Sequence, residues 1–300
     1  MDDLTERRRS AEGDVAAKAE ANLWASWFAA LGTSFGERYG AKVVEFGDAV
    51  TVTVPEIPRT YYNRVFHLGG RDVEQLDDIV RWYTGQRTPF RVDIAPSNCD
   101  EDLLAAFDSY GFRIRGFQSV LRSTPTAVMP GPPAGVLVRE VRRDEIGYFC
   151  DLYESAYFGG VSGTGALARF REDGIRARSE DPRWRFYLAF VDDAPAAGAI
   201  AFFNAGVASL AGAATLPTQR GRGCQTALLH RRIADAHASG CALVVSRCTA
   251  GSISQRNMER AGLQVAYTKL IWEYRSDHVT LDLPRSARSG SGPELLQALA

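Results

Sequence analysis

Hydrophobic residues recur along the chain at spacings that alternate between helical and extended segments. Near the start, apolar residues from Trp24 to Leu31 lie at i, i+3, i+4 and i+7, the spacing of one helix face. Shorter runs rich in β-branched and aromatic residues, bounded by turn residues, predict strands. In the first half we predict helices at 15–31, 73–84 and 100–110, and strands at 50–54, 64–68, 90–94 and 113–121.

The second half has a clearer pattern, in which three strands follow one another before the longest helix. Tight hairpin turns are predicted at 192–195 and 204–206, where Asp, Asn, Pro and Gly gather. The order is strand, two helices, three strands, helix, strand, helix, strand, which predicts a mixed sheet with helices on its faces. The predicted strands are 136–141, 184–191, 197–203, 208–216, 241–249 and 265–274, and the helices are 144–157, 163–178, 222–239 and 252–261.

A Pro- and Gly-rich segment at 124–135 separates the two halves and is typical of a linker. The helix–glycine–strand pattern around Gly111 recurs around Gly262, 151 residues later, which favours duplication of one fold. We therefore predict an α+β (mixed α/β) chain of two related domains. Their bounds are 1–123 and 136–283, with the linker at 124–135 and a flexible tail at 284–300.

Composition excludes several classes of function for this chain of 300 residues. The formal net charge is −1, from 35 basic and 36 acidic residues, which gives no reason to expect nucleic acid or an anionic membrane as partner. No apolar run approaches the length of a membrane span, and none follows the charged N-terminus as in a secretory signal. Five cysteines without CxxC spacing and four scattered histidines favour neither disulfides nor a metal site, so we expect a cytoplasmic protein.

The segment with the strongest chemical signal joins an apolar strand to the longest helix of the second half. It contains Arg220, Gly221, Arg222 and Gly223. Glycines let a backbone approach a ligand closely, and the first N–H groups of a helix bind anions. The segment therefore predicts a pyrophosphate site, although a plain turn with solvated arginines fits its residues equally well. A dinucleotide-binding loop is rejected, because Thr226 stands where that motif has its third glycine.

These residues resemble the GNAT superfamily of acetyl-CoA-dependent N-acyltransferases. The superfamily motif [R/Q]-x-x-G-x-[G/A] is matched by 220–225 except at its last position, where Gln225 replaces the small residue, and the later polar element is matched by 251–263. The resemblance covers residues 136 to about 274. It implies two tandem GNAT-like domains, each a mixed, largely antiparallel sheet with helices on both faces. The first domain, which lacks the motif, resembles a degenerate copy.

The resemblance also implies which residues hold acetyl-CoA, with no metal involved. The backbone of the preceding strand would pair with the pantetheine arm, the loop would bind the pyrophosphate, and the later helix would add polar contacts. For the arm the implied residues are Ala213, Ala214 and Thr215, for the pyrophosphate Gly221, Arg222, Gly223, Cys224, Gln225 and Thr226, and for the later helix Ser254 and Asn257.

The chain departs from the superfamily at its catalytic positions. Met258 stands where members commonly have a tyrosine acid, and the strand 208–215 carries no carboxylate to act as base. The acid could be Tyr267, Ser254 or a water molecule. The base could be Glu154, or one of Asp151, Glu172 and Asp173. Tyr153 and Tyr157, one helical turn apart, could line an acceptor pocket or belong to the core.

The expected function is transfer of an acetyl group from acetyl-CoA to a small-molecule amine, by direct attack of the amine on the thioester. Two alternatives stay open. One is an acyl-CoA-binding protein with little or no activity, because the usual acid and base are missing. The other is an acetyltransferase acting on protein N-termini or lysines. The protein is expected to be a monomer or a homodimer.

Overall fold

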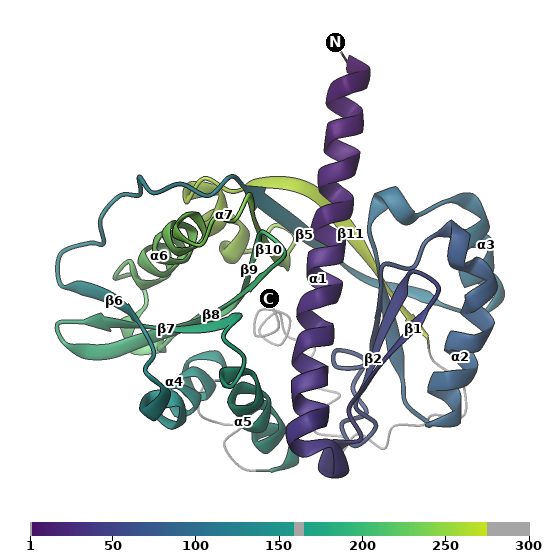
Figure 1. Ribbon diagram of the computed structural model, residues 1–300, viewed down its shortest axis with the longest axis horizontal. Coiled ribbons are helices and arrows are strands. Elements are labelled where there is room, and N and C mark those ends of the chain that lie inside the picture. Colours follow the sequence, from purple (N-terminus) through teal and green to yellow (C-terminus); the bar gives the residue numbers. More distant parts are fainter. Residues whose placement is uncertain (1, 159–164, 275–300) are drawn as a thin grey trace. The chain divides into compact units, whose positions relative to one another are not determined.

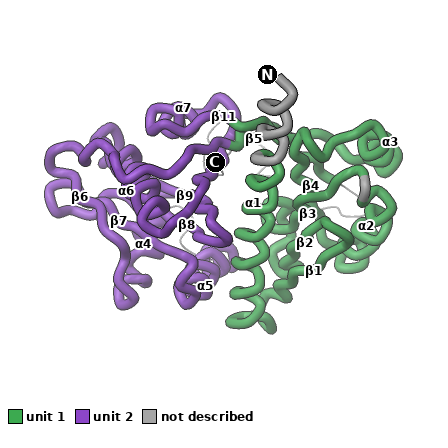
Figure 2. The backbone as a smooth tube through the Cα atoms, turned by 45° about the horizontal axis from the view of Figure 1, so that its top comes forward, with its two compact units in different colours: residues 1–120, 266–299 green, residues 121–265, 300 purple. Residues whose placement is uncertain are grey.

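The computed structural model describes residues 2–158 and 165–274, so the predicted tail at 284–300 lies outside the described residues. The described chain divides into two compact units (Figure 2). The N-terminal unit comprises residues 2–120 and 266–274, and the C-terminal unit comprises residues 121–265. Each is a mixed α/β structure, as predicted.

The C-terminal unit is built on strands in the order β10-β9-β8-β7-β6. Neighbouring strands are antiparallel except β9 and β10, which are parallel. The sheet is therefore mixed and largely antiparallel. Its elements are β6 (Val136–Glu140), α4 (Ile146–Phe158), α5 (Ala166–Ser179), β7 (Trp184–Val191), β8 (Ala194–Asn204), β9 (Val207–Thr215), α6 (Cys224–Ala238), β10 (Leu243–Thr249) and α7 (Ile253–Arg260).

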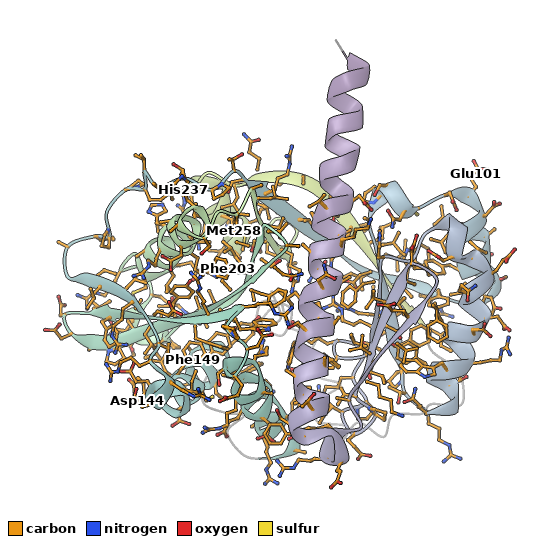
Figure 3. All side chains as sticks on the ribbon, in the orientation of Figure 1. Glu101, Asp144, Phe149, Phe203, His237 and Met258 are labelled. Atoms are coloured by element: carbon orange, nitrogen blue, oxygen red, sulfur yellow. The ribbon has the colours of Figure 1, made fainter. Side chains whose placement is uncertain are left out.

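Helices cover both faces of this sheet. Helices α4 and α5 lie on one side of β7–β9, and α6 and α7 lie on the other (Figure 1). Phe149 of α4 and Met258 of α7 accordingly approach the sheet from opposite sides (Figure 3). The face under α6 holds a continuous apolar core, in which Leu228 and Leu229 are fully buried.

Two tight turns connect β7, β8 and β9 as the sequence predicts. Asp192 and Asp193 both have positive φ in the first turn, and Ala205 and Gly206 have positive φ in the second. Positive φ at both central residues is the type I′ geometry, whose twist matches that of antiparallel strands. The first turn places Asp192 beside the segment that leads into α6, because Arg222 reaches its carboxylate.

The N-terminal unit has strands in the order β1-β2-β3-β4-β11-β5. Here too one neighbouring pair, β3 with β4, is parallel, whereas β1–β2, β2–β3 and β4–β11 are antiparallel. The elements are α1 (Asp2–Tyr39), β1 (Lys42–Phe46), β2 (Ala49–Thr53), β3 (Arg64–Phe66), α2 (Leu76–Gly85), β4 (Phe90–Ile94), α3 (Glu101–Ser109), β5 (Arg113–Ser123) and β11 (Gln264–Tyr274).

Helix α1 covers one face of these strands, and α2 and α3 cover the other (Figure 1). On the α1 side, Trp24 stacks on Phe66 of β3, with ring centroids 5.7 Å apart. On the other side, Tyr83 of α2 stacks on Phe90 of β4 at 4.2 Å. The Tyr83 hydroxyl also donates to the carbonyl of Val52, which ties α2 to the middle of the sheet.

Strand β11 differs in position from the sequence prediction, which places 265–274 in the second domain. From Ala266 onward it belongs to the N-terminal unit, where it pairs with β4. Trp272 packs on Phe107 at 5.1 Å, and Tyr274 packs on Phe112 at 5.2 Å. The strand completes the aromatic core of this unit, which explains its position.

A buried charged group also fixes β11 in the N-terminal unit. The ammonium group of Lys269, 3% exposed, lies 2.7 Å from both carboxylate oxygens of Glu20 and 2.6 Å from Oδ2 of Asp93. Arg64 also bonds to Asp93. Burial raises the pKa of Asp93, but the charges of Arg64, Arg91 and Lys269 outweigh burial and hold that pKa well below its ordinary value. Glu20, Asp93 and Lys269 thereby join α1, β4 and β11.

The repeat seen in the sequence is present at both of its positions. Helices α3 and α7 end in the same way, with Gly111 at φ +76° and Gly262 at φ +92°. The next residue then donates to a carbonyl five residues earlier, Phe112 to Phe107 and Leu263 to Met258. Only glycine adopts this backbone conformation at little cost, so both halves depend on it.

Candidate active site

The segment between β9 and α6 forms an exposed loop with two left-handed glycines. A short 3₁₀ turn at Pro217–Gln219 ends at Arg220. Gly221 then has φ +78°, and Gly223, the residue before α6, has φ +82°. Gly221 and Arg222 are exposed. Because the first turn of α6 has N–H groups without intrahelical partners, this loop presents donors and a positive dipole end to an anion.

Arg222 is held beside this loop by the β7–β8 turn. Its Nη2 lies 2.5 Å from Oδ2 of Asp192, and its Nη1 lies 3.4 Å from Oε1 of Gln219. The side chains of both members of the ion pair are exposed, so the pair adds little to stability. Arg222 can therefore exchange Asp192 for a phosphate at small cost.

The linker predicted at 124–135 lies against the same loop. A Cβ atom at Gly223 would lie 2.6 Å from Cγ of Pro133. Nδ1 of His230, in α6, lies 3.1 Å from the carbonyl oxygen of Pro130, and Met129 packs against the core of the unit. Gly223 is thus required both by its φ and by its contact with the linker.

Among the other motif residues, Cys224 contributes only its main chain to the loop. Its side chain is 2% exposed and packs in the core under α6. Burial raises the pKa of its thiol, which outweighs the lowering expected at a helix N-terminus. Gln225 and Thr226 are half-buried in the first turn of α6.

Strand β9 has an irregularity in its pairing with β8, and its other edge is partly open. Its pairing with β8 passes from Ala199↔Ala213 to Ala201↔Leu210, so β9 contains one extra residue at 211–212. On the other side, its parallel pairing with β10 ends at Ser246↔Leu210. Residues 211–215 therefore have an edge facing β10 without a pairing partner in the described strands.

The direction of the backbone groups along 213–215 follows from one hydrogen bond. The N–H of Leu216 donates to the carbonyl of Ala196 on β8 at 2.9 Å. Because backbone groups of successive residues point to opposite sides of a strand, those of Ala214 also point to β8. The groups of Ala213 and Thr215 point to the open edge. Of the three residues predicted to pair with a pantetheine arm, two therefore have their backbone groups on the open edge, and Ala214 has its backbone groups toward β8.

Helix α7 brings the predicted polar residues Ser254 and Asn257 into the same unit as the loop. Both are half-buried, and Oδ1 of Asn257 accepts a hydrogen bond from Arg260. Met258, the residue after Asn257, is 6% exposed and shares a core cluster with Cys224 at the start of α6. Its side chain therefore packs α7 against α6 and offers no proton.

The predicted base Glu154 is held in an ion pair. Nε of Arg171 lies 2.8 Å from its Oε2, and Nη2 of Arg171 bonds to Oε1. Arg171 also lies over the ring of Phe158 at 3.8 Å. Both carboxylate oxygens of Glu154 are bound by one guanidinium group, and this contact fastens α5 to α4.

The predicted acid Tyr267 lies in the N-terminal unit, and the loop 220–226 lies in the C-terminal unit. Its ring lies 3.8 Å from the position of a Cβ at Gly13 of α1. With Glu20 and Lys269, it lines a small cavity of the N-terminal unit. These contacts are with α1 and with the buried charges.

Tyr153 contacts the irregular part of β9. A Cβ atom at Gly212 would overlap the Tyr153 hydroxyl and would lie 3.2 Å from Cζ. The ring is half-buried and stacks between Phe149 and Tyr157, with centroids 5.4 Å from each. Its spacing from Tyr157 was visible in the sequence, but its partner glycine was not.

The N-terminal unit has carboxylates where the C-terminal unit has its loop. After β3, the N–H of Gly69 donates to Oδ2 of Asp72 at 3.2 Å. A Cβ atom at Gly70 would overlap the carboxylate of Asp100. Two negative side chains thus occupy the space beside this glycine pair, and they would repel a phosphate.

No family model matches the chain, and a search of curated proteins found no relative. Solved structures are similar in fold. One is a GCN5-related N-acetyltransferase from Kribbella flavida. The match covers 86% of this chain and 96% of that protein's chain, with a TM-score of 0.60 and 18% sequence identity. A GCN5-related N-acetyltransferase from Sphaerobacter thermophilus is also similar. The match covers 77% of this chain and 81% of that protein's chain, with a TM-score of 0.54 and 18% sequence identity.

A tandem GNAT protein from the clavulanic acid biosynthesis pathway is also similar. It matches 75% of this chain with 77% of its own, at a TM-score of 0.56 and 14% identity. The chain therefore has the GNAT acetyltransferase fold in tandem arrangement, and the predicted fold is confirmed. No helix among residues 2–158 and 165–274 is long and apolar enough to cross a membrane.

Proposed function

We propose that the protein transfers an acetyl group from acetyl-CoA to the amino group of a small molecule. The C-terminal unit would hold the coenzyme. The observation that carries the proposal is the alignment of two features: the glycine-rich anion loop at 220–226 follows directly on β9, whose edge at 213–215 is open. A pyrophosphate at the loop would leave the pantetheine arm to run back along that edge.

The residues that would hold the coenzyme act mainly through their main chain. N–H groups from Gly221 to Thr226 would donate to the pyrophosphate, and Arg222 would add a positive charge. Ala213 and Thr215 would pair with the amides of the pantetheine arm. Ser254 and Asn257 on α7 would add side-chain contacts. The coenzyme supplies an activated thioester, and a main-chain N–H in the irregular part of β9 would polarise its carbonyl oxygen.

Calorimetric titration of the full-length protein with acetyl-CoA tests the binding site. Gly221→Asp puts a carboxylate where phosphate should bind, and it should abolish binding. Gly206→Asp is the matched control, because Gly206 has a similar φ of +74° and, like Gly221, has no atom within 4 Å of an added Cβ. Equal affinity of the two variants would contradict the placement of the coenzyme.

A second assay tests the reaction. Purified protein, acetyl-CoA and a panel of amines are mixed, and free CoA is followed over time. Turnover on a small amine supports the proposal. Acetyl-CoA binding without turnover on any amine would favour an inactive acyl-CoA-binding protein, which the buried Met258 makes the main competitor. Turnover on peptide amines alone would favour a protein acetyltransferase.

A further inference from the structure

Tyr153 is fixed at the irregular part of β9 by two glycines on neighbouring strands. Gly198 of β8 leaves room for its ring, because a Cβ there would lie 3.3 Å from Cδ2 of Tyr153. Gly212 of β9 leaves room for its hydroxyl. With Phe149 and Tyr157 stacked on either side, the ring has little freedom to turn away. The hydroxyl is thereby held directly over residue 212.

This place coincides with the expected end of the pantetheine arm. From the anion loop, the open edge of β9 runs through Thr215 and Ala213 to the extra residue at 211–212. An arm paired along that edge carries its thioester to the irregularity. The reacting carbon and sulfur would then lie beside Gly212, which the Tyr153 hydroxyl already contacts.

A buried cation lies near this hydroxyl. Arg232 of α6 is 1% exposed, and it donates to the carbonyls of Leu228 at 3.0 Å and Ile200 at 3.1 Å. Burial lowers the pKa of Arg232 to about 10, and its charge interacts with the hydroxyl groups of Tyr187 and Tyr153. A nearby positive charge stabilises a phenolate, so it helps a tyrosine to give up its proton.

We propose that the Tyr153 hydroxyl is the acid that protonates the sulfur of the departing CoA. The inference rests on the proposed function. The amine nitrogen forms a bond to the thioester carbon, the carbon–sulfur bond breaks, and the sulfur takes the tyrosine proton. The phenolate then takes the surplus proton from the ammonium nitrogen of the product, directly or through water. No further reactant is needed, and Met258 is not required to act.

The first test measures binding and turnover separately. Tyr153→Phe should bind acetyl-CoA as tightly as the wild type by calorimetry, while kcat falls about 100-fold, at the lower end of acid–base effects. Tyr148→Phe on the same helix is the control, because its side chain is 46% exposed, and its kcat should stay unchanged. An unchanged kcat in Tyr153→Phe would overturn the inference.

A double-mutant cycle tests the geometry itself. Gly212→Ala should lower kcat in the wild type, because the new methyl group displaces the hydroxyl. In a Tyr153→Phe background the overlapping oxygen is absent, so the same change should cost little more. Full additivity of the two losses would overturn the inference. If the wild type has no turnover on any amine, the proposed function itself fails, a result distinct from active wild type with active Tyr153→Phe.

Discussion

The ion pair between Arg222 and Asp192 should compete with the coenzyme for the arginine. Replacing Asp192 with Asn removes the competitor without straining the turn, because Asn is among the residues that tolerate positive φ best. Arg222 would then be available to a phosphate before the coenzyme arrives. Asp192→Asn should therefore bind acetyl-CoA more tightly than the wild type.

The size of the effect follows from the exposure of the pair. The side chains of Arg222 and Asp192 are 48% and 67% exposed, and such pairs contribute about 0.2–1 kcal/mol. Because about 1.4 kcal/mol is a tenfold change, the dissociation constant should fall by about 1.4–5-fold. Calorimetric titration at low ionic strength, where screening is weakest, measures it best.

Asp193 provides the control, because it is the next residue of the same turn and is also exposed. Asp193→Asn removes the same charge from nearly the same place but leaves the ion pair intact. The reasoning is refuted if the two variants bind acetyl-CoA equally well. It is also refuted if Asp192→Asn still strengthens binding beyond that of Asp193→Asn when Arg222 is replaced with Ala.

Three further predictions concern stability. Lys269→Met leaves two buried carboxylates without their ammonium partner, so it should lower the free energy of unfolding by about 3–5 kcal/mol in urea titrations. Lys18→Met breaks only an exposed ion pair and should lower the free energy of unfolding by less than about 0.5 kcal/mol. Gly111→Ala and Gly262→Ala should each cost about 1 kcal/mol by the same method, because nothing lies within 4 Å of an added Cβ and only the left-handed backbone resists it. Hydrogen bonds from the Arg139 side chain and the Arg142 main-chain N–H lower the pKa of Glu145 from 4.5 to about 2. The ionised Glu145 therefore stabilises the fold fully above pH 4.5, and this stabilisation is lost as the pH falls through 2. Melting temperatures of Glu145→Gln should therefore converge with those of the wild type only at the acid end.

Local signals in the sequence predicted much of the fold and the outline of the site. Backbone preferences of individual residues determine the turns at 192–195 and 204–206 and the loop before α6. Such preferences are local, so they do not depend on distant parts of the chain. Helix α6 was predicted at 222–239 and spans Cys224–Ala238. The duplicated helix–glycine–strand ends were predictable for the same reason, since the need for glycine is local.

Other features depend on partners far away in the chain. The pattern of apolar and polar residues in β11 would be the same in either unit, so its pairing with β4 could not be predicted from the sequence. The edge strand β1 was missed, and α1 extends beyond 15–31 to Asp2–Tyr39. In the candidate site, the ion pair of Glu154 with Arg171 joins two helices and could not be predicted from the sequence. The contact of Tyr153 with Gly212 joins residues 59 positions apart and leaves no pattern in the sequence.

The position of β11 has a consequence for how the protein is made. Glu20 and Lys269 are separated by 249 residues, so the sheet that contains β1 to β4 lacks β11 until about 170 further residues have been synthesised after β4. Contacts of such long range slow folding, because a large loop must close first. During that delay, residues 121–265 emerge as one continuous stretch and can fold ahead of the part translated before them. Cutting the gene in the Pro-rich segment would therefore not release two working halves, since the earlier fragment would lack the strand that closes its sheet.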